Sequence, residues 1–142
     1  MKRVAALAPF SEDHHRELSH ARRLLRAAGG SPEARLAAAQ TYVQAFFDET
    51  VEHFRREEEE LFPLYGRHAG RTQLLERILQ EHMQLHGLVR ALRTYVVAGD
   101  VPAAELRVLG SLLRDHVRAE ERELFEQIQQ VVPEAKLAEL RP

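Results

Sequence analysis

Histidine and glutamate recur in this chain four residues apart, a spacing that suits joint binding of metal ions. Three pairs show it: His53 with Glu57, His82 with His86, and His116 with Glu120. On an α-helix such pairs share one face and can reach one ion or two adjacent ions. The chain has eight histidines and no cysteine, so thiolate sites are excluded. Imidazole and carboxylate together suit iron, manganese or zinc.

The charge balance narrows the classes of partner. The 142 residues carry 20 Lys and Arg against 22 Asp and Glu, a formal net charge of −2. This balance lacks the basic footprint of a nucleic-acid-binding or membrane-surface protein, so neither partner is expected. We find no apolar run of the roughly 20 residues that cross a bilayer. The apolar start is too short for a secretory signal, so we expect a cytoplasmic protein.

Apolar residues recur at steps of three and four, which predicts an all-α protein. Four helices are expected, over about 11–29, 32–62, 72–98 and 102–132. The first would begin at Ser11, and the second would stop or kink at Pro63 before a loop from Tyr65 to Gly70. Short connections predict an antiparallel up-down-up-down four-helix bundle. We expect one domain over 1–142, with its core at about 11–132 and a short helix in the tail, 133–142.

Helical geometry predicts which side chains of the second helix face the core. At 100° per residue, its apolar stripe comprises Val43, Phe46, Phe47, Thr50, Phe54 and Leu61. Glu57 projects within about 20° of the stripe centre, and His53 lies on its edge, about 60° away. A buried carboxylate needs a cation or hydrogen bonds, so Glu57 is predicted to have a partner.

The same geometry selects residues on the third and fourth helices. His82 and His86 fall inside the stripe of the third helix, one turn apart. On the fourth helix, Glu120 lies within roughly 40° of His116, whereas Glu121 is about 140° away. We therefore expect Glu120 to point inward. The other acids of these runs, Glu58, Glu59, Glu121 and Glu123, are expected on solvated faces, with a supporting role for Glu123 left open.

The first helix offers three histidines. His14 lies about 30° from the core direction, His20 near 90° and His15 near 130°. His14 is therefore the predicted inward residue. His15 remains an alternative because helix starts are uncertain by a residue or two.

A faint internal repeat relates the two halves of the chain. The pattern H-x-x-x-E-E-x-E-L-F occurs at 53–62 and again at 116–125. An acid directly precedes a histidine at 13–14 and at 81–82. Two hairpins related by a pseudo-two-fold axis would place Glu57 and Glu120 across a shared centre. Each glutamate would then be able to bridge two metals.

From His14 to about Phe125, the chain resembles the hemerythrin-like family, also called the HHE cation-binding domain. That resemblance implies a four-helix bundle with two non-haem iron ions joined by an oxo or hydroxo bridge. It implies one iron held by His82, His86 and His116, and another held by His14 (or His15) and His53. Glu57 and Glu120 would bridge both. The second iron would have one ligand fewer and an open position for a small molecule.

One departure limits what the resemblance implies. Oxygen-carrying invertebrate members have an aspartate five residues after the last histidine, whereas this chain has Glu120 four residues after His116. This spacing is similar to the broader bacterial branch, so oxygen transport does not transfer directly. We expect a di-iron protein that binds or senses O2, NO or peroxide, and more readily a binding protein than an enzyme.

Several alternatives stay open from the sequence. The same centre could serve a redox enzyme, as an oxidase, peroxidase or nitric-oxide-handling site, or it could store or donate iron. Zinc or manganese could substitute for iron. A metal-free bundle with polar core histidines is the simplest competing hypothesis. The expected assembly is a monomer or a small homo-oligomer.

Overall fold

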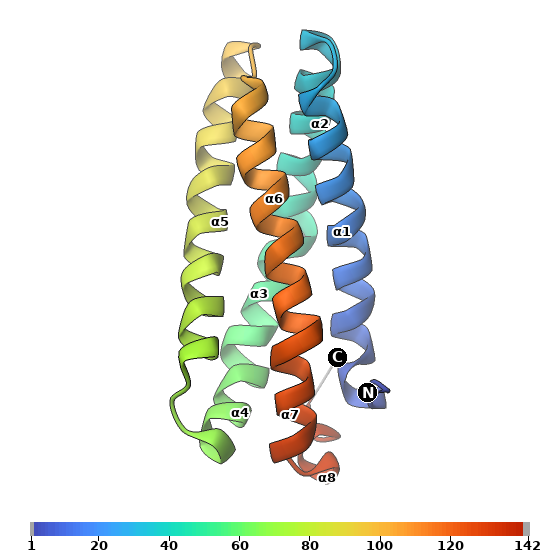
Figure 1. The fold of residues 1–142 in the computed structure, drawn as a ribbon, viewed down its shortest axis with the longest axis vertical. Coiled ribbons are helices and arrows are strands. Elements are labelled where there is room, and N and C mark those ends of the chain that lie inside the picture. The colour runs from blue at the N-terminus through green and yellow to red at the C-terminus, as the bar shows by residue number, and fades with distance from the viewer. Residues whose placement is uncertain (1, 141–142) are drawn as a thin grey trace.

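A computed structural model describes residues 2–140, which form helices and connections without a β-strand. Four helical columns lie side by side (Figure 1). Their segments, in chain order, are η1 (Ala5–Leu7) and α1 (Ala8–Ala28); α2 (Pro32–Ala45), η2 (Phe46–Thr50), α3 (Val51–Arg56), η3 (Glu57–Leu61) and α4 (Phe62–Ala69); α5 (Gln73–Ala98); α6 (Ala103–Ala119), η4 (Glu120–Leu124) and α7 (Phe125–Val131). A short α8 (Glu134–Leu137) follows. The all-α prediction is confirmed.

Local sequence signals explain where several columns begin and end. The Ser31 and Thr72 side chains accept hydrogen bonds of 3.1 Å from the backbone N–H groups of Ala34 and Leu75. These contacts satisfy N–H groups that a helix start leaves free. Gly99 ends α5 with φ of 78°, a left-handed conformation that glycine adopts without steric strain.

Three π-helical turns interrupt the columns: η2, η3 and η4. A π-turn fits one more residue into a turn than an α-helix, and such turns occur frequently at functional sites. Two of them begin at Glu57 and at Glu120, the corresponding positions of the internal repeat. The backbone is therefore altered in the same way at both predicted bridging carboxylates.

The structure corrects the predicted start of the first helix. It begins at Ala8 rather than Ser11, because Pro9 fits the first turn, where its missing N–H costs nothing. Leu7 and Phe10 are buried, so packing favours this longer helix.

The structure also corrects the second column at three positions. The column continues through Pro63, because η3 ends at Leu61 and Pro63 falls in the first turn of α4. Tyr65 is a buried helical residue rather than the start of a loop. Phe47 was placed in the apolar stripe but is 46% exposed, since it lies in η2, where the 100° step does not apply.

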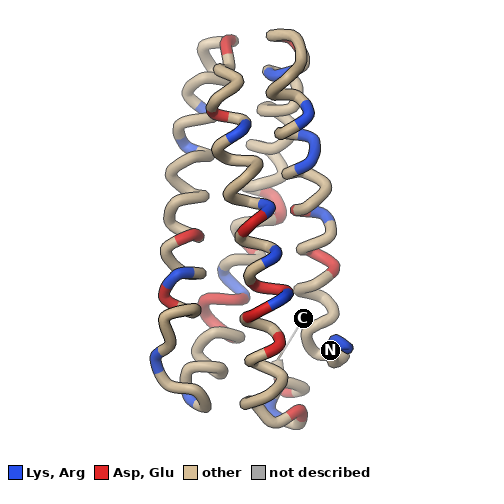
Figure 2. Tube along the Cα trace, in the orientation of Figure 1, with Lys and Arg blue, Asp and Glu red and all other residues tan. Residues whose placement is uncertain are grey.

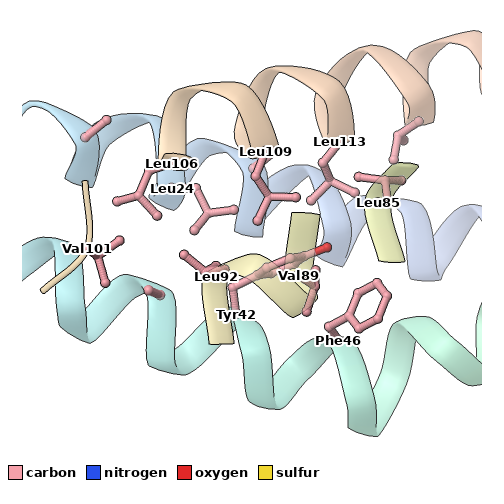
Figure 3. Close-up of a cluster of buried hydrophobic side chains, with 14 of the residues drawn as sticks. Leu24, Tyr42, Phe46, Leu85, Val89, Leu92, Val101, Leu106, Leu109 and Leu113 are labelled. Atoms are coloured by element: carbon pink, nitrogen blue, oxygen red, sulfur yellow. The ribbon is translucent and has the colours of Figure 1, made fainter. Parts of the chain in front are cut away.

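The apolar core consists of two clusters with a polar layer between them. The larger cluster includes the labelled side chains of Figure 3, from Leu24 and Tyr42 to Leu113. The other is built around Phe10, Leu61 and Phe125. Along α1, the buried His14 lies between Phe10 of one cluster and Ala21 of the other. In the other three columns, a buried polar residue likewise lies between members of the two clusters: Glu57 between Phe54 and Leu61, His82 between Leu85 and Ile78, and Glu120 between Val117 and Leu124. The polar layer therefore crosses all four columns.

Helices α1 and α6 pack closely at Gly110. A Cβ on Gly110 would lie 2.8 Å from Leu25 Cγ, so α1 and α6 pack at a distance that requires glycine.

Figure 2 shows acidic positions of η3 and η4 at a similar height along the columns. None of the helices within residues 2–140 is long and apolar enough to cross a membrane.

Candidate metal centre

Six side chains from the four columns meet in the polar layer, and each is at most 3% exposed. They are His14, His53, Glu57, His82, His116 and Glu120. Their ligand atoms form two groups that could each hold a metal ion. One group contains His14, His53, Glu57 and Glu120, and the other contains His82, His116 and Glu120. All six were predicted to face the core.

Glu57 directs its two carboxylate oxygens toward different histidines. Its Oε2 lies 3.3 Å from His53 Nε2 and 3.6 Å from His14 Nε2. Its Oε1 lies 3.3 Å from His82 Nε2. The carboxylate therefore spans the two groups of imidazoles.

Glu120 spans the same two groups from the opposite column. Its Oε1 lies 2.9 Å from His116 Nε2 and 3.2 Å from His82 Nε2. Its Oε2 lies 2.8 Å from His14 Nε2. The structure thus brings the two glutamates into equivalent positions, as the repeat predicts.

Each of the four histidines also contacts a carboxylate on its outer side, through Nδ1. These contacts pair His14 with Glu121 at 2.7 Å, His53 with Asp13 at 2.9 Å, His82 with Glu58 at 2.8 Å and His116 with Glu81 at 2.9 Å. A carboxylate only accepts, so Nδ1 is the donor in each bond. In a neutral imidazole, Nε2 then offers a lone pair toward the centre, as metal-binding histidines require.

The inner atoms have unused ligand capacity. Both oxygens of Glu57 are buried, lie 3.3–3.6 Å from the histidine nitrogens and form no hydrogen bond among residues 2–140. Glu120 Oε2 and His116 Nε2 have closer charged neighbours, at 2.8 and 2.9 Å, but these contacts do not have the geometry of a hydrogen bond. Buried polar atoms are normally hydrogen-bonded, and unpaired ones need a physical explanation. Cations held by these donors would satisfy them, so the residues fit a metal site with nitrogen and oxygen ligands.

Electrostatics supports the same interpretation. Burial lowers the pKa of His53, but the charge of Glu57 and the bond to Asp13 outweigh it and raise that pKa to about 10. Contacts with Glu120 likewise raise the pKa of His82 to about 11 and of His116 to about 9 against the effect of burial. The buried carboxylates therefore attract positive charge strongly. Metal ions would compete with protons for this position.

A family comparison agrees with the geometry. Residues 7–128 match the model of the hemerythrin HHE cation-binding domain. The chain belongs to the hemerythrin HHE family. No curated protein and no solved structure gives a significant match.

The hemerythrin match includes all seven predicted ligands, but the structure places one of them apart. His86 is half-buried and lies outside the two groups of ligand atoms. Its ring centroid is 5.1 Å from that of Phe46 and 5.8 Å from that of Phe54. Its role as a ligand therefore stays a prediction. For the first helix, the structure buries His14 and exposes His15.

The four outer carboxylates of this hemerythrin domain were not predicted as partners of histidine. Glu58 and Glu121 were expected on solvated faces; Glu58 is indeed exposed and Glu121 is half-buried, but each also accepts a hydrogen bond from a buried histidine of another column. A signal was present in the sequence. The repeat contains paired acids at 57–58 and 120–121 and an acid before the histidine at 13–14 and 81–82. Each of these extra acids is one of the outer acceptors.

A further buried acid of the hemerythrin domain, Glu17, was also missed. It is 4% exposed, and neither carboxylate oxygen has a hydrogen-bond partner among residues 2–140. Burial raises the pKa of this carboxyl, while His53 and His14 oppose that effect. It lies three residues after His14 on α1, about one helical turn beyond that predicted ligand.

Proposed function

We propose that this hemerythrin-family protein holds two non-haem iron ions and binds or senses dioxygen or a related small molecule such as NO or peroxide. Support comes from the two carboxylates that span two groups of imidazoles. A site for a single metal ion would not need a carboxylate that spans two groups of imidazoles. Two acids with both oxygens aimed at different imidazole groups favour a pair of ions.

The proposal includes the arrangement of the columns. We assign them to an antiparallel up-down-up-down four-helix bundle, consistent with short connections that join neighbours at alternate ends (Figure 1). Such bundles commonly hold metals with side chains from facing helices. The cytoplasmic location and the monomeric or small oligomeric state expected from the sequence stay predictions.

The residues around the centre would have three different roles: binding the ions, orienting the imidazoles and limiting the access of water. His14 and His53 would hold one ion and His82 and His116 the other, with His86 as the additional ligand and the two glutamates shared. Bound iron would supply a redox-active Lewis acid able to bind a small molecule at an open position. The outer carboxylates hold each imidazole in the tautomer that can bind a metal. The two apolar clusters limit the access of water to the layer.

The first experiment is to measure iron, zinc and manganese per chain, together with the optical spectrum of the reduced protein before air, after air and after degassing. We expect about two irons and an oxygen-dependent band that disappears when the gas is removed. Two irons with irreversible oxidation would favour the redox-enzyme or iron-handling alternatives. No metal after anaerobic reconstitution would overturn the proposal.

Substitutions make the assignment specific. Glu57→Ala is expected to abolish binding of the second iron while the protein stays helical by circular dichroism. Glu59 is a matched control, because it is exposed and paired with Arg55 on the outside of the same column. Glu59→Ala should retain both irons. If Glu57→Ala also retains both, the assignment of Glu57 as a bridging ligand is wrong.

A further inference from the structure

A small cavity lies beside the proposed metal centre, on the side of His53. It has a volume of about 10 Å³ and is lined by Asp13, Arg16, Glu17, Glu49, Thr50 and His53. Glu17, Thr50 and His53 are buried, whereas the Arg16 and Glu49 side chains are 55% and 51% exposed. The cavity therefore extends from the surface toward a predicted metal ligand.

The carboxyl group of Glu17 lacks a protein partner that explains its burial. Both of its oxygens are unpaired within the described chain. Burying such a group without a partner is unfavourable. A cavity of this volume is close to the minimum that holds one water molecule, which also needs polar partners. The Glu17 carboxyl provides such partners, and Thr50, whose hydroxyl also contacts the Tyr42 hydroxyl, lines the same cavity.

The internal repeat shows that these polar residues belong to one half of the centre only. Glu17 follows His14 by three residues, and Leu85 follows His82 by three. Thr50 precedes His53 by three residues, and Leu113 precedes His116 by three. Leu85 and Leu113 are fully buried in the larger apolar cluster. One half is thus closed by leucines where the other has a carboxyl group and a hydroxyl group.

We propose that Glu17 and Thr50 form a water-binding site that controls which small molecules reach the His14–His53 end of the centre. A water held there occupies the cavity beside His53. A weakly hydrogen-bonding gas such as NO must displace this water, whereas a hydrogen-bonding ligand can replace its contacts. The site therefore favours polar small molecules over apolar gases. The control of ligand access rests on the proposed function, because it assumes a metal ion at the His14–His53 end. The water site itself does not depend on that function.

The water site can be tested on the metal-free protein. A high-resolution crystal structure is expected to show one ordered water within hydrogen-bonding distance of Glu17 and Thr50. In solution, the Thr50 methyl group should show a nuclear Overhauser effect to a long-lived water. Both signals should disappear in Glu17→Leu, which copies Leu85 of the other half. Their absence from the wild-type protein would overturn the proposal.

The effect on ligand entry is tested on the reduced, iron-loaded protein by flash photolysis with NO. Glu17→Leu is expected to raise the association rate constant about tenfold, because no ordered water has to leave. Glu17→Gln keeps hydrogen-bonding capacity and should change the rate less. Glu12→Gln, which removes an exposed carboxylate from the same helix, should leave the rate unchanged.

The outcomes separate this inference from the proposed function. Iron content and circular dichroism are measured on each variant, and unchanged values show that the centre and the fold are intact. Equal NO rates in wild type and Glu17→Leu would overturn the control of access. Loss of iron from Glu17→Leu would instead make Glu17 a ligand and also overturn the proposal. If the wild-type protein binds no iron, the proposed function fails, while the crystal structure still decides the water site.

Discussion

The Nδ1 atom of His14 donates a hydrogen bond of 2.7 Å to Glu121, which lies 107 residues further along the chain. This bond joins α1 to η4. It also fixes the ring so that Nε2 points at Glu57 and Glu120. The equivalent bond in the other half runs from His82 to Glu58. A pair of outer carboxylates thus ties the H-x-x-x-E columns to the other two.

Removal of an outer carboxylate should weaken metal binding without preventing it. Glu58→Gln is expected to lower metal affinity by about 10- to 100-fold, because His82 loses the acceptor that holds its tautomer and orientation. The measurement is competition with a chelator of known affinity. Glu121→Gln should act in the same way through His14.

An exposed acid from the same run provides the comparison. Glu59→Gln should leave the affinity within experimental error of wild type, because its carboxylate pairs with Arg55 at the surface. Equal affinities for Glu58→Gln and Glu59→Gln would show that the outer bond does not support metal binding.

The two neighbouring histidines of α1 should differ sharply on substitution. His14→Ala is expected to lose iron, because His14 is 1% exposed and its Nε2 faces both glutamates. His15→Ala should keep full iron content, because His15 is exposed. Iron analysis of the two purified variants is sufficient. Loss of iron from His15→Ala but not from His14→Ala would show that His15 is the ligand.

His86 needs its own test, because its ring contacts phenylalanines outside the two groups of ligand atoms. We expect His86→Ala to bind one iron instead of two, since the residue lies one turn from His82 on α5. His20→Ala should be nearly neutral for iron content. Two irons in His86→Ala would identify His86 as a packing residue beside Phe46 and Phe54.

The stability of the metal-free protein should fall as pH rises. His53, His82 and His116 have pKa values raised from 6.5 to about 10, 11 and 9. The folded state therefore binds more protons than the unfolded state above pH 6.5. Their stabilising contribution is complete below about 6.5 and is lost as pH rises through 9 to 11. The check is the Tm of chelator-treated protein across this range.

The iron-loaded protein should respond to pH in the opposite direction. Protons compete with metal for the imidazoles, so metal affinity rises with pH until they are deprotonated. Metal bound to the folded state raises Tm by mass action. The gap between loaded and metal-free Tm values should therefore widen from pH 6 to pH 9. A constant gap would contradict ligation by these histidines.

Much of the centre followed from helical periodicity. The 100° step placed Glu57 and His82 in the core and preferred Glu120 over Glu121, and the structure buries all three preferred residues. His82 lies within α5, and Glu57 and Glu120 come directly after the last residues of α3 and α6, so each keeps its phase with the α-helical turn before it. Capping residues such as Ser31 and Thr72 act locally, which is why helix starts there were predictable.

The rest depended on backbone changes and on contacts between columns. Phe47 lies inside a π-turn, and Tyr65 lies beyond one, so a uniform helical step does not describe either residue. Glu58 and Glu121 bind histidines of other columns. A helical wheel describes one helix at a time and contains no term for such partners. Only the packed arrangement shows that an outward acid on one column is a neighbour of an inward histidine on the next.

The π-turns at Glu57 and Glu120 also act as inserted residues within their columns. Without one, the residues beyond it would meet their neighbours rotated by about 100°, one residue's step of an α-helix. Deletion of Glu60, for example, would leave His53 and Glu57 in phase with the larger apolar cluster but turn Phe62 and Tyr65 away from the other. Because of this extra residue, the side chains before the π-turn and those after it can both face the core within one continuous column. It joins a half that presents the predicted metal ligands to a half that packs in the smaller apolar cluster.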